Sequence, residues 1–173
     1  QFSASFDVFF RALDSAEVKI KKAISILNKG GLSRSRDMAE VLVVLAFLHR
    51  QRGHLKEAES IYKEIIALLE SNYGPESGVL SSYFRQISEI QQDMGQYIEA
   101  NSYLKKNLAV SKAVYGDQHY KTSKAYESLA YLHIQMGDHK KGDELSKQAL
   151  MIMAKAKGKL DPEYAMLLRQ SAI

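Results

Sequence analysis

The stretch GQYIEA at residues 95–100 has counterparts at a constant distance on both sides, GHLKEA at 53–58 and GDHKKG at 137–142. A second set of glycines, Gly74, Gly116 and Gly158, repeats with the same step of 42 residues. A fixed period of this length indicates stacked copies of one structural unit. The period therefore predicts a repeat array, and it directs the search for function to an extended surface.

Apolar residues between these glycines are spaced as on one face of a helix. Leu42, Leu45 and Leu48 precede Gly53 at intervals of three, and apolar residues keep intervals of three and four from there to Gly74. Glycine tolerates the left-handed backbone that ends many helices. Each unit is therefore predicted to be a helical hairpin: helix A, a glycine turn, helix B and a second glycine turn. The expected fold class is all-α, a right-handed superhelical solenoid of antiparallel helix hairpins.

Small residues recur at one position of each predicted helix. Two helices need small side chains where their backbones come closest. We expect this close approach at Ala46, Ser88 and Ala130 in helix A, and at Ala58, Ala100 and Gly142 in helix B.

The period also predicts the domain organisation. We expect one solenoid domain over 1–173, with a half-repeat at 1–32, repeats at 33–74, 75–116 and 117–158, and a half-repeat at 159–173. Residues 12–28 match a helix B, and 6–10 are interpreted as the remnant of its helix A. Asp161-Pro162 predicts the start of a last helix A. Because the chain begins with Gln1, we expect it to be a piece of a longer protein.

Composition excludes several classes of function. The chain has 173 residues, no cysteine, no tryptophan and a net charge of +4. Without cysteine it has no disulfide framework and no thiolate site. Its longest apolar run, 41–48, is far shorter than the roughly 20 residues of a membrane span. Basic residues are not interleaved with aromatic ones, so no nucleic-acid surface is predicted. We expect a cytoplasmic protein, and an organelle lumen remains the alternative.

Neither catalysis nor metal binding is predicted. Phosphate-binding loops, nucleophile elbows and paired metal-binding histidine motifs are absent from the sequence. His49 and His133 occupy equivalent positions two repeats apart, about 20 Å by helix-packing distances, and cannot share a metal. Carboxylates spread along an array do not converge on one pocket. We therefore expect a protein that is not an enzyme and that needs no cofactor.

The residues around the helix A–helix B turn resemble the tetratricopeptide repeat. Leu45-Ala46 followed by GHLKEA at 53–58 is similar to the family pattern L-A…G-x-Y-x-x-A, and GQYIEA at 95–100 is more similar still. Armadillo and HEAT arrays have comparable periods but lack this turn. The 42-residue period and the loops GDQH at 116–119 and GKLDP at 158–162 resemble the kinesin light chain subfamily. The resemblance covers about residues 12 to 173.

The resemblance implies a scaffold that binds a peptide or helix of a partner in a concave groove lined by helices A. It places the partner-binding groove at Glu40, Val43, Phe47, Arg50, Gln51, Ser82, Arg85, Glu89, Gln92, Asp93, Lys124, Glu127, Tyr131, Ile134 and Gln135.

Two departures from the family bear on the ligand. The paired asparagines of kinesin light chain repeats are replaced by Val43-Val44, Arg85-Gln86 and Glu127-Ser128. Val43 and Phe47 also stand where a carboxylate-binding clamp would begin. The expected groove is apolar at its N-terminal end and mixed in charge further along, which suits an amphipathic helix or a short segment that is both apolar and charged.

Alternatives remain open at three places. The apolar run 41–48 is either buried on both sides between hairpins or presents Val43 and Phe47 as an anchor for a partner. Phe6, Phe9 and Phe10 either have lost their packing against an absent helix, which we favour, or form a similar anchor for a partner. The alternative function is self-association, in which open array ends stack on another copy as a structural element of a larger protein.

Overall fold

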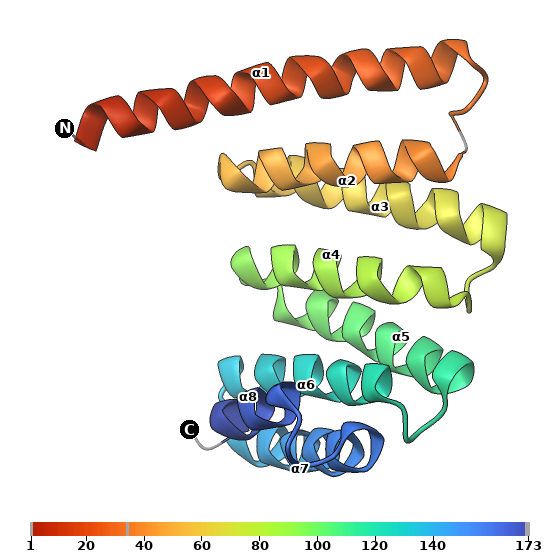
Figure 1. Ribbon diagram of the computed structural model, residues 1–173, viewed down its shortest axis with the longest axis vertical. Coiled ribbons are helices and arrows are strands. Elements are labelled where there is room, and N and C mark those ends of the chain that lie inside the picture. Colours follow the sequence, from red (N-terminus) through yellow and green to blue (C-terminus); the bar gives the residue numbers. More distant parts are fainter. Residues whose placement is uncertain (1, 34, 172–173) are drawn as a thin grey trace. The chain divides into compact units, whose positions relative to one another are not determined.

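The computed structural model describes residues 2–33 and 35–171, with side chains described for 13–33 and 35–169. Helices account for all the regular structure in these ranges, and no strand occurs there. The elements are α1 (Phe2–Lys29), α2 (Arg36–Gln51), α3 (Leu55–Tyr73), the 3-10 turn η1 (Gly78–Leu80), α4 (Ser81–Asp93), α5 (Tyr97–Tyr115), α6 (Tyr120–Gln135), α7 (His139–Lys157) and α8 (Pro162–Ser171) (Figure 1).

The helices form two compact units, each described here by itself. The first ends at Asn72 and contains α1, α2 and almost all of α3. The second begins at Tyr73 and contains α4 to α8. Within the second unit α4 packs on α5, α5 on α6, and α6 on α7, as expected for consecutive antiparallel hairpins. The predicted all-α fold class is confirmed.

The glycines of both ladders occupy the backbone conformation that the period predicts. All six have positive φ, between 75° and 89°. At Gly95, in the turn from α4 to α5, a Cβ atom would meet nothing within 4 Å. Glycine is therefore required there for its backbone conformation and not for lack of space. The same holds at Gly116, where α5 ends.

The first helix corrects one prediction. α1 runs without a break from Phe2 to Lys29, so residues 6–10 are not a separate helix A. The ladder position 42 residues before Gly53 is Arg11, and without a helix breaker the helix continues. α1 is followed by Gly31, whose φ is 72°, one residue before the position that the period from Gly74 would give. The interpretation of Phe6, Phe9 and Phe10 lies outside the described side chains.

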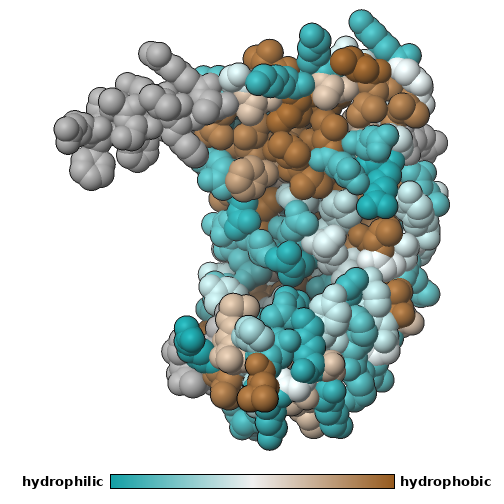
Figure 2. Space-filling model, in the orientation of Figure 1, coloured by the Kyte–Doolittle hydropathy of each residue, from teal (hydrophilic) through white to brown (hydrophobic). Residues whose placement is uncertain are grey.

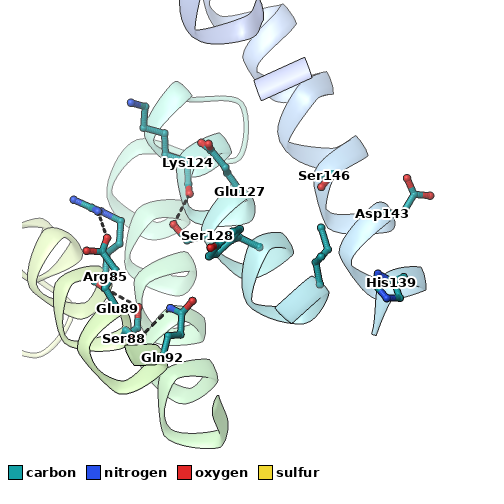
Figure 3. A pocket seen from close by; sticks show the side chains of 12 residues that line it. Arg85, Ser88, Glu89, Gln92, Lys124, Glu127, Ser128, His139, Asp143 and Ser146 are labelled. Carbon is teal, nitrogen blue, oxygen red and sulfur yellow. Dashed lines mark hydrogen bonds and ion pairs between the residues drawn. The ribbon is translucent and has the colours of Figure 1, made fainter. Parts of the chain in front are cut away.

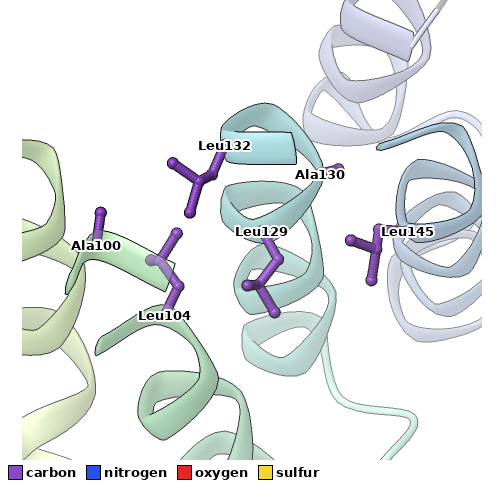
Figure 4. Close-up of a cluster of buried hydrophobic side chains, with 6 residues drawn as sticks. All are labelled: Ala100, Leu104, Leu129, Ala130, Leu132 and Leu145. Atoms are coloured by element: carbon purple, nitrogen blue, oxygen red, sulfur yellow. The ribbon is translucent and has the colours of Figure 1, made fainter. Parts of the chain in front are cut away.

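The small residues predicted at close helix approaches are all buried. Ala46, Ala58, Ser88 and Ala100 are fully inaccessible, and Ala130 nearly so. In the second unit, Ala100 and Ala130 belong to an apolar cluster in which α6 lies between α5 and α7 (Figure 4). The cluster consists of Ala100, Leu104, Leu129, Ala130, Leu132 and Leu145.

The last helix is held on α6 and α7 by apolar and ionic contacts. Leu167 of α8 is buried against Ala149 and Met153 of α7. Asp161 Oδ1 accepts a hydrogen bond of 2.8 Å from the amide of Glu163, which confirms the predicted helix start. Lys124 of α6 joins Glu163 at 2.9 Å, so an ion pair also ties α8 to α6.

In the first unit, Arg52 links α1 to the turn between α2 and α3. Its guanidinium pairs with Asp14 at 2.5 Å and with Glu17, and Lys21 joins Glu17 at 2.6 Å. These bonds hold the Glu17 carboxylate in its charged form. They lower the pKa of Glu17 to about 2, the hydrogen bond from Lys21 contributing most and that from Arg52 next.

Candidate functional site

The second unit contains a hollow of about 920 Å³ in front of α6. In the close-up, α6 lies between α4, which carries Arg85 and Glu89, and α7, which carries His139 and Asp143 (Figure 3). We call it the α6 hollow. It is lined by Arg85, Ser88, Glu89, Gln92, Lys124, Glu127, Ser128, Tyr131, Ile134, His139, Asp143 and Ser146.

The α6 hollow brings together seven of the residues that the sequence predicted for a groove. Three come from α4 and four from α6: Arg85, Glu89, Gln92, Lys124, Glu127, Tyr131 and Ile134. Ser82, Asp93 and Gln135 are exposed on the same two helices but do not line the hollow. That the seven residues bind a partner stays a prediction.

The remaining predicted residues lie on α2, in the first unit. Glu40, Val43, Phe47, Arg50 and Gln51 are half-buried or exposed. Figure 2 shows hydrophobic side chains gathered over the α1 and α2 region of this unit.

The apolar run 41–48 is not buried on both sides. Leu42, Ala46 and Leu48 are buried, but Phe47 is 53% exposed and Val44 is also exposed. The interpretation as a doubly buried segment is therefore wrong. The other interpretation, an anchor for a partner at Val43 and Phe47, stays a prediction, because exposure alone does not identify a ligand.

The sequence did not predict the part of the lining that α7 supplies. His139, Asp143 and Ser146 follow each other at intervals of four and three, so they share one face of the helix. The family resemblance assigns the groove to helices A, and α7 is a helix B, so this polar stripe was not considered. Ser88 and Ser128 also line the hollow, and their hydroxyls bond backbone carbonyls of their own helices. The sequence assigned Ser88 to a close helix approach and Ser128 to the place of a family asparagine, so neither was predicted as a groove residue.

Most charged groups of the α6 hollow are held in ion pairs. Arg85 pairs with Glu89 one turn further along α4. Lys124 pairs with Glu163 of α8, and Asp143 pairs at 2.6 Å with Lys147, outside the hollow. Along α4, the Gln92 side-chain amide donates a 3.1 Å hydrogen bond to the Ser88 carbonyl one turn earlier. These bonds restrain polar side chains of the hollow on α4, α6 and α7.

Glu127 differs from these charged groups, because burial is the main influence on its carboxyl. Burial raises the pKa of its carboxyl above the ordinary value, because removing water disfavours the charged form. The positive charges of Lys124 and Arg85 oppose this shift, and the negative charge of Glu163 adds to it. Glu163 itself has a lowered pKa, because hydrogen bonds from Lys157 and then Lys124 stabilise its carboxylate.

The α6 hollow combines apolar, polar and charged side chains. Two apolar side chains, Tyr131 and Ile134, are 60% and 37% exposed on it. Across the described side chains, no group of three His, Cys, Asp or Glu residues could hold a metal ion. In the same part of the chain, no helix is long and apolar enough to span a membrane. Side chains from three helices, α4, α6 and α7, would offer a ligand charged, polar and apolar contacts.

Comparison with known families identifies the repeat. The tetratricopeptide repeat model matches residues 37–106 and again 79–155, which together cover more than half of the chain. The chain therefore belongs to the tetratricopeptide repeat family. Proteins of this family are typically non-enzymatic scaffolds for protein–protein interaction. No curated protein sequence matches the chain.

Solved structures confirm the fold and its resemblance to kinesin light chain. A variant of a putative kinesin light chain from Podospora anserina with nearly identical TPR-like repeats is 17% identical, with a TM-score of 0.75 over 98% of this chain and 82% of that one. BtubC (BKLC) from P. vanneervenii is 18% identical, with a TM-score of 0.72 over 90% of this chain. The chain spans 65% of the length of BtubC.

A third similar structure contains a bound segment. PcrH, solved in complex with the chaperone binding region of PopB, is 19% identical to this chain. Its TM-score is 0.57, over 80% of this chain and 94% of PcrH. At this level of identity the likeness concerns the fold.

Proposed function

We propose that the chain is a non-enzymatic interaction module whose α6 hollow binds a segment of another protein. The observation that carries the proposal is the convergence of seven groove residues, expected from the family resemblance, on one hollow of about 920 Å³. This volume lies at the upper end of the range for ligand pockets, and three helices contribute to its wall. Such a hollow has room for several side chains of a peptide or helix.

Affinity would come mainly from Tyr131 and Ile134. Both are large, exposed and surrounded by polar groups, which is the usual arrangement around an interface hot spot. Specificity would come from the charged side chains of the same hollow, since a mispaired buried charge penalises a wrong ligand. The PcrH–PopB complex supports the proposal by analogy, because it pairs a similar fold with a segment of another protein.

An affinity capture experiment tests this proposal. The immobilised chain, a Tyr131→Ala/Ile134→Ala variant and an Ile98→Ala control are incubated with the same cell extract, and retained proteins are identified by mass spectrometry. Ile98 is a suitable control because it is 78% exposed and does not line the hollow. Proteins kept by the native chain and the control but lost from the double variant would support the proposal. Identical sets for all three proteins would refute it.

Self-association is the second candidate function. It is favoured by the apolar side chains that α8 leaves exposed, Met166 and Leu168. Light scattering over a range of concentrations tests it. A dimer that disappears in a Met166→Ser/Leu168→Ser variant would support assembly through α8, and a monomer at all concentrations would exclude it.

A further inference from the structure

The charged side chains of the α6 hollow are not all satisfied. Arg85 and Glu89 pair with each other, and Lys124 and Asp143 pair with residues outside the hollow. Glu127 is the exception: in the part of the chain that the structure describes, it has no direct hydrogen bond or ion pair. It lies half-buried on the central helix of the hollow.

A half-buried carboxylate without a partner has lost water and gained little in exchange. Burial raises the pKa of Glu127, and the two cations that oppose this shift, Lys124 and Arg85, are engaged with other carboxylates. An ammonium or guanidinium group brought by a ligand would supply the missing charge-assisted bond. An anionic ligand group would instead add to the repulsion from Glu163.

The balance of charge on the lining points the same way. Three carboxylates, Glu89, Glu127 and Asp143, face the hollow, against the two cations Arg85 and Lys124. The whole chain has the opposite sign, +4. The acidic character is therefore local to the hollow and would act at short range, on a group that has already entered it.

An apolar contact lies beside the free carboxylate. Tyr131 and Ile134 follow Glu127 at intervals of four and three, so the three side chains form one stripe along α6. Glu127 and Tyr131 are about 6 Å apart along the helix axis, from the rise of 1.5 Å per residue. A ligand that meets both must carry a cationic and an apolar side chain at a similar separation.

We propose that the α6 hollow binds a partner segment in which a Lys or Arg side chain pairs with Glu127 and an apolar side chain about 6 Å away packs on Tyr131 and Ile134. This inference rests on the proposed function and specifies its ligand. It assigns to Glu127 the selection of basic over acidic segments.

Selection from a phage-displayed library of random peptides tests the inference. The library is panned on the intact chain, and the enriched peptides are synthesised. Their affinities are measured by fluorescence anisotropy for the native chain, Glu127→Gln, Tyr131→Ala and Glu99→Gln. Glu99 provides the matched control, because it is an exposed carboxylate of α5 that does not line the hollow.

Enriched peptides should carry a Lys or Arg near an apolar residue. Glu127→Gln should weaken their binding about tenfold, the size expected for loss of one partly buried charged contact. Glu99→Gln should change it less than about twofold, as expected for an exposed charge outside the interface. A Glu127→Lys variant should bind peptides in which the basic residue is replaced by Glu, a gain that misfolding cannot produce.

The outcomes separate this inference from the proposed function. If Tyr131→Ala weakens binding but Glu127→Gln does not, or if the enriched peptides are not basic, the pairing with Glu127 is overturned while the hollow remains the binding site. If no peptide is retained, or if neither substitution changes the affinity, both proposals are overturned.

Discussion

Gly142 of α7 lies so close to Ile134 of α6 that a Cβ atom built on the glycine would be 2.5 Å from Ile134 Cγ1. The equivalent positions of the two earlier hairpins hold Ala58 and Ala100. The third hairpin thus combines a smaller residue on helix B with a branched residue on helix A. The exposed Ile134 that lines the α6 hollow is accommodated by the missing methyl group of Gly142.

Gly142→Ala should therefore be more destabilising in the native chain than in an Ile134→Ala variant. In the native background, overpacking costs about 1–3 kcal/mol, against about 1 kcal/mol gained from replacing a helical glycine. Without Ile134 the overpacking is reduced to a contact of 3.2 Å between the added Cβ atom and the Ala130 carbonyl oxygen. Urea denaturation of the four proteins of this double-mutant cycle measures the coupling. Equal effects of Gly142→Ala in the two backgrounds would contradict the contact.

Gly95→Ala should destabilise the turn between α4 and α5 by about 1–2 kcal/mol, the cost of placing a residue with a Cβ atom in left-handed backbone. The φ of Gly95 is 75°, and a methyl group would meet no neighbour, so the cost is conformational. Gly95→Asn should lose less, because asparagine tolerates this region. The midpoints of thermal unfolding compare the two variants. Equal losses for Ala and Asn would show that backbone conformation is not the cause.

The stability of the native chain should fall in acid partly through Glu17. Because the pKa of Glu17 is lowered to about 2, its ion pairs stabilise the fold above the ordinary carboxyl pKa of 4.5. That contribution is lost as the pH falls from about 4.5 to about 2. We expect about 1 kcal/mol, the scale of partly exposed ion pairs.

Glu17→Gln should lower stability at pH 7 and make it less sensitive to acid between pH 5 and pH 2. Urea midpoints at several pH values measure both effects. Glu57→Gln provides the control, because Glu57 is an exposed carboxylate in the first turn of α3. A slope as steep in Glu17→Gln as in the native chain would exclude a role for this cluster.

Glu163→Gln should loosen α8. The carboxylate bonds Lys157 and Lys124, and these bonds lower the pKa of Glu163 because they favour its charged form. Both partners are partly exposed, so the global stability should change by less than about 1 kcal/mol. Hydrogen exchange of the α8 amides should nevertheless become faster, while exchange in α5 stays the same. Unchanged exchange in α8 would show that Leu167 alone holds the helix.

The fold could be predicted because its determinants are local. Each ladder glycine ends a helix by its own backbone preference, and the residues between ladders carry the helical period. Where the period failed, the reason is equally local: Arg11 replaces a glycine, and α1 continues through the expected turn. The turn after α1 uses Gly31, one residue before the position that the period gives. The position of a turn is therefore set by where the helix-breaking residue stands.

The α6 hollow was predictable only in part. Repeat position places Arg85 and Glu127 on equivalent faces of α4 and α6, and both line the hollow. Repeat position does not reveal that α7 contributes His139, Asp143 and Ser146 to the lining. That contribution depends on how α7 packs against α6 around Gly142. Nor does repeat position show whether an apolar residue such as Phe47 is covered, since burial depends on neighbours distant in sequence.

Lys124 lines the α6 hollow and also anchors α8 through its ion pair with Glu163. A ligand charge that competes for Lys124 would consequently weaken the attachment of the C-terminal helix. A cation beside Glu127 leaves Lys124 with Glu163, whereas an anion competes for Lys124 and releases one anchor. Binding of an anionic group in the hollow and the docking of α8 would then be thermodynamically linked, and each would shift the other by the same free energy.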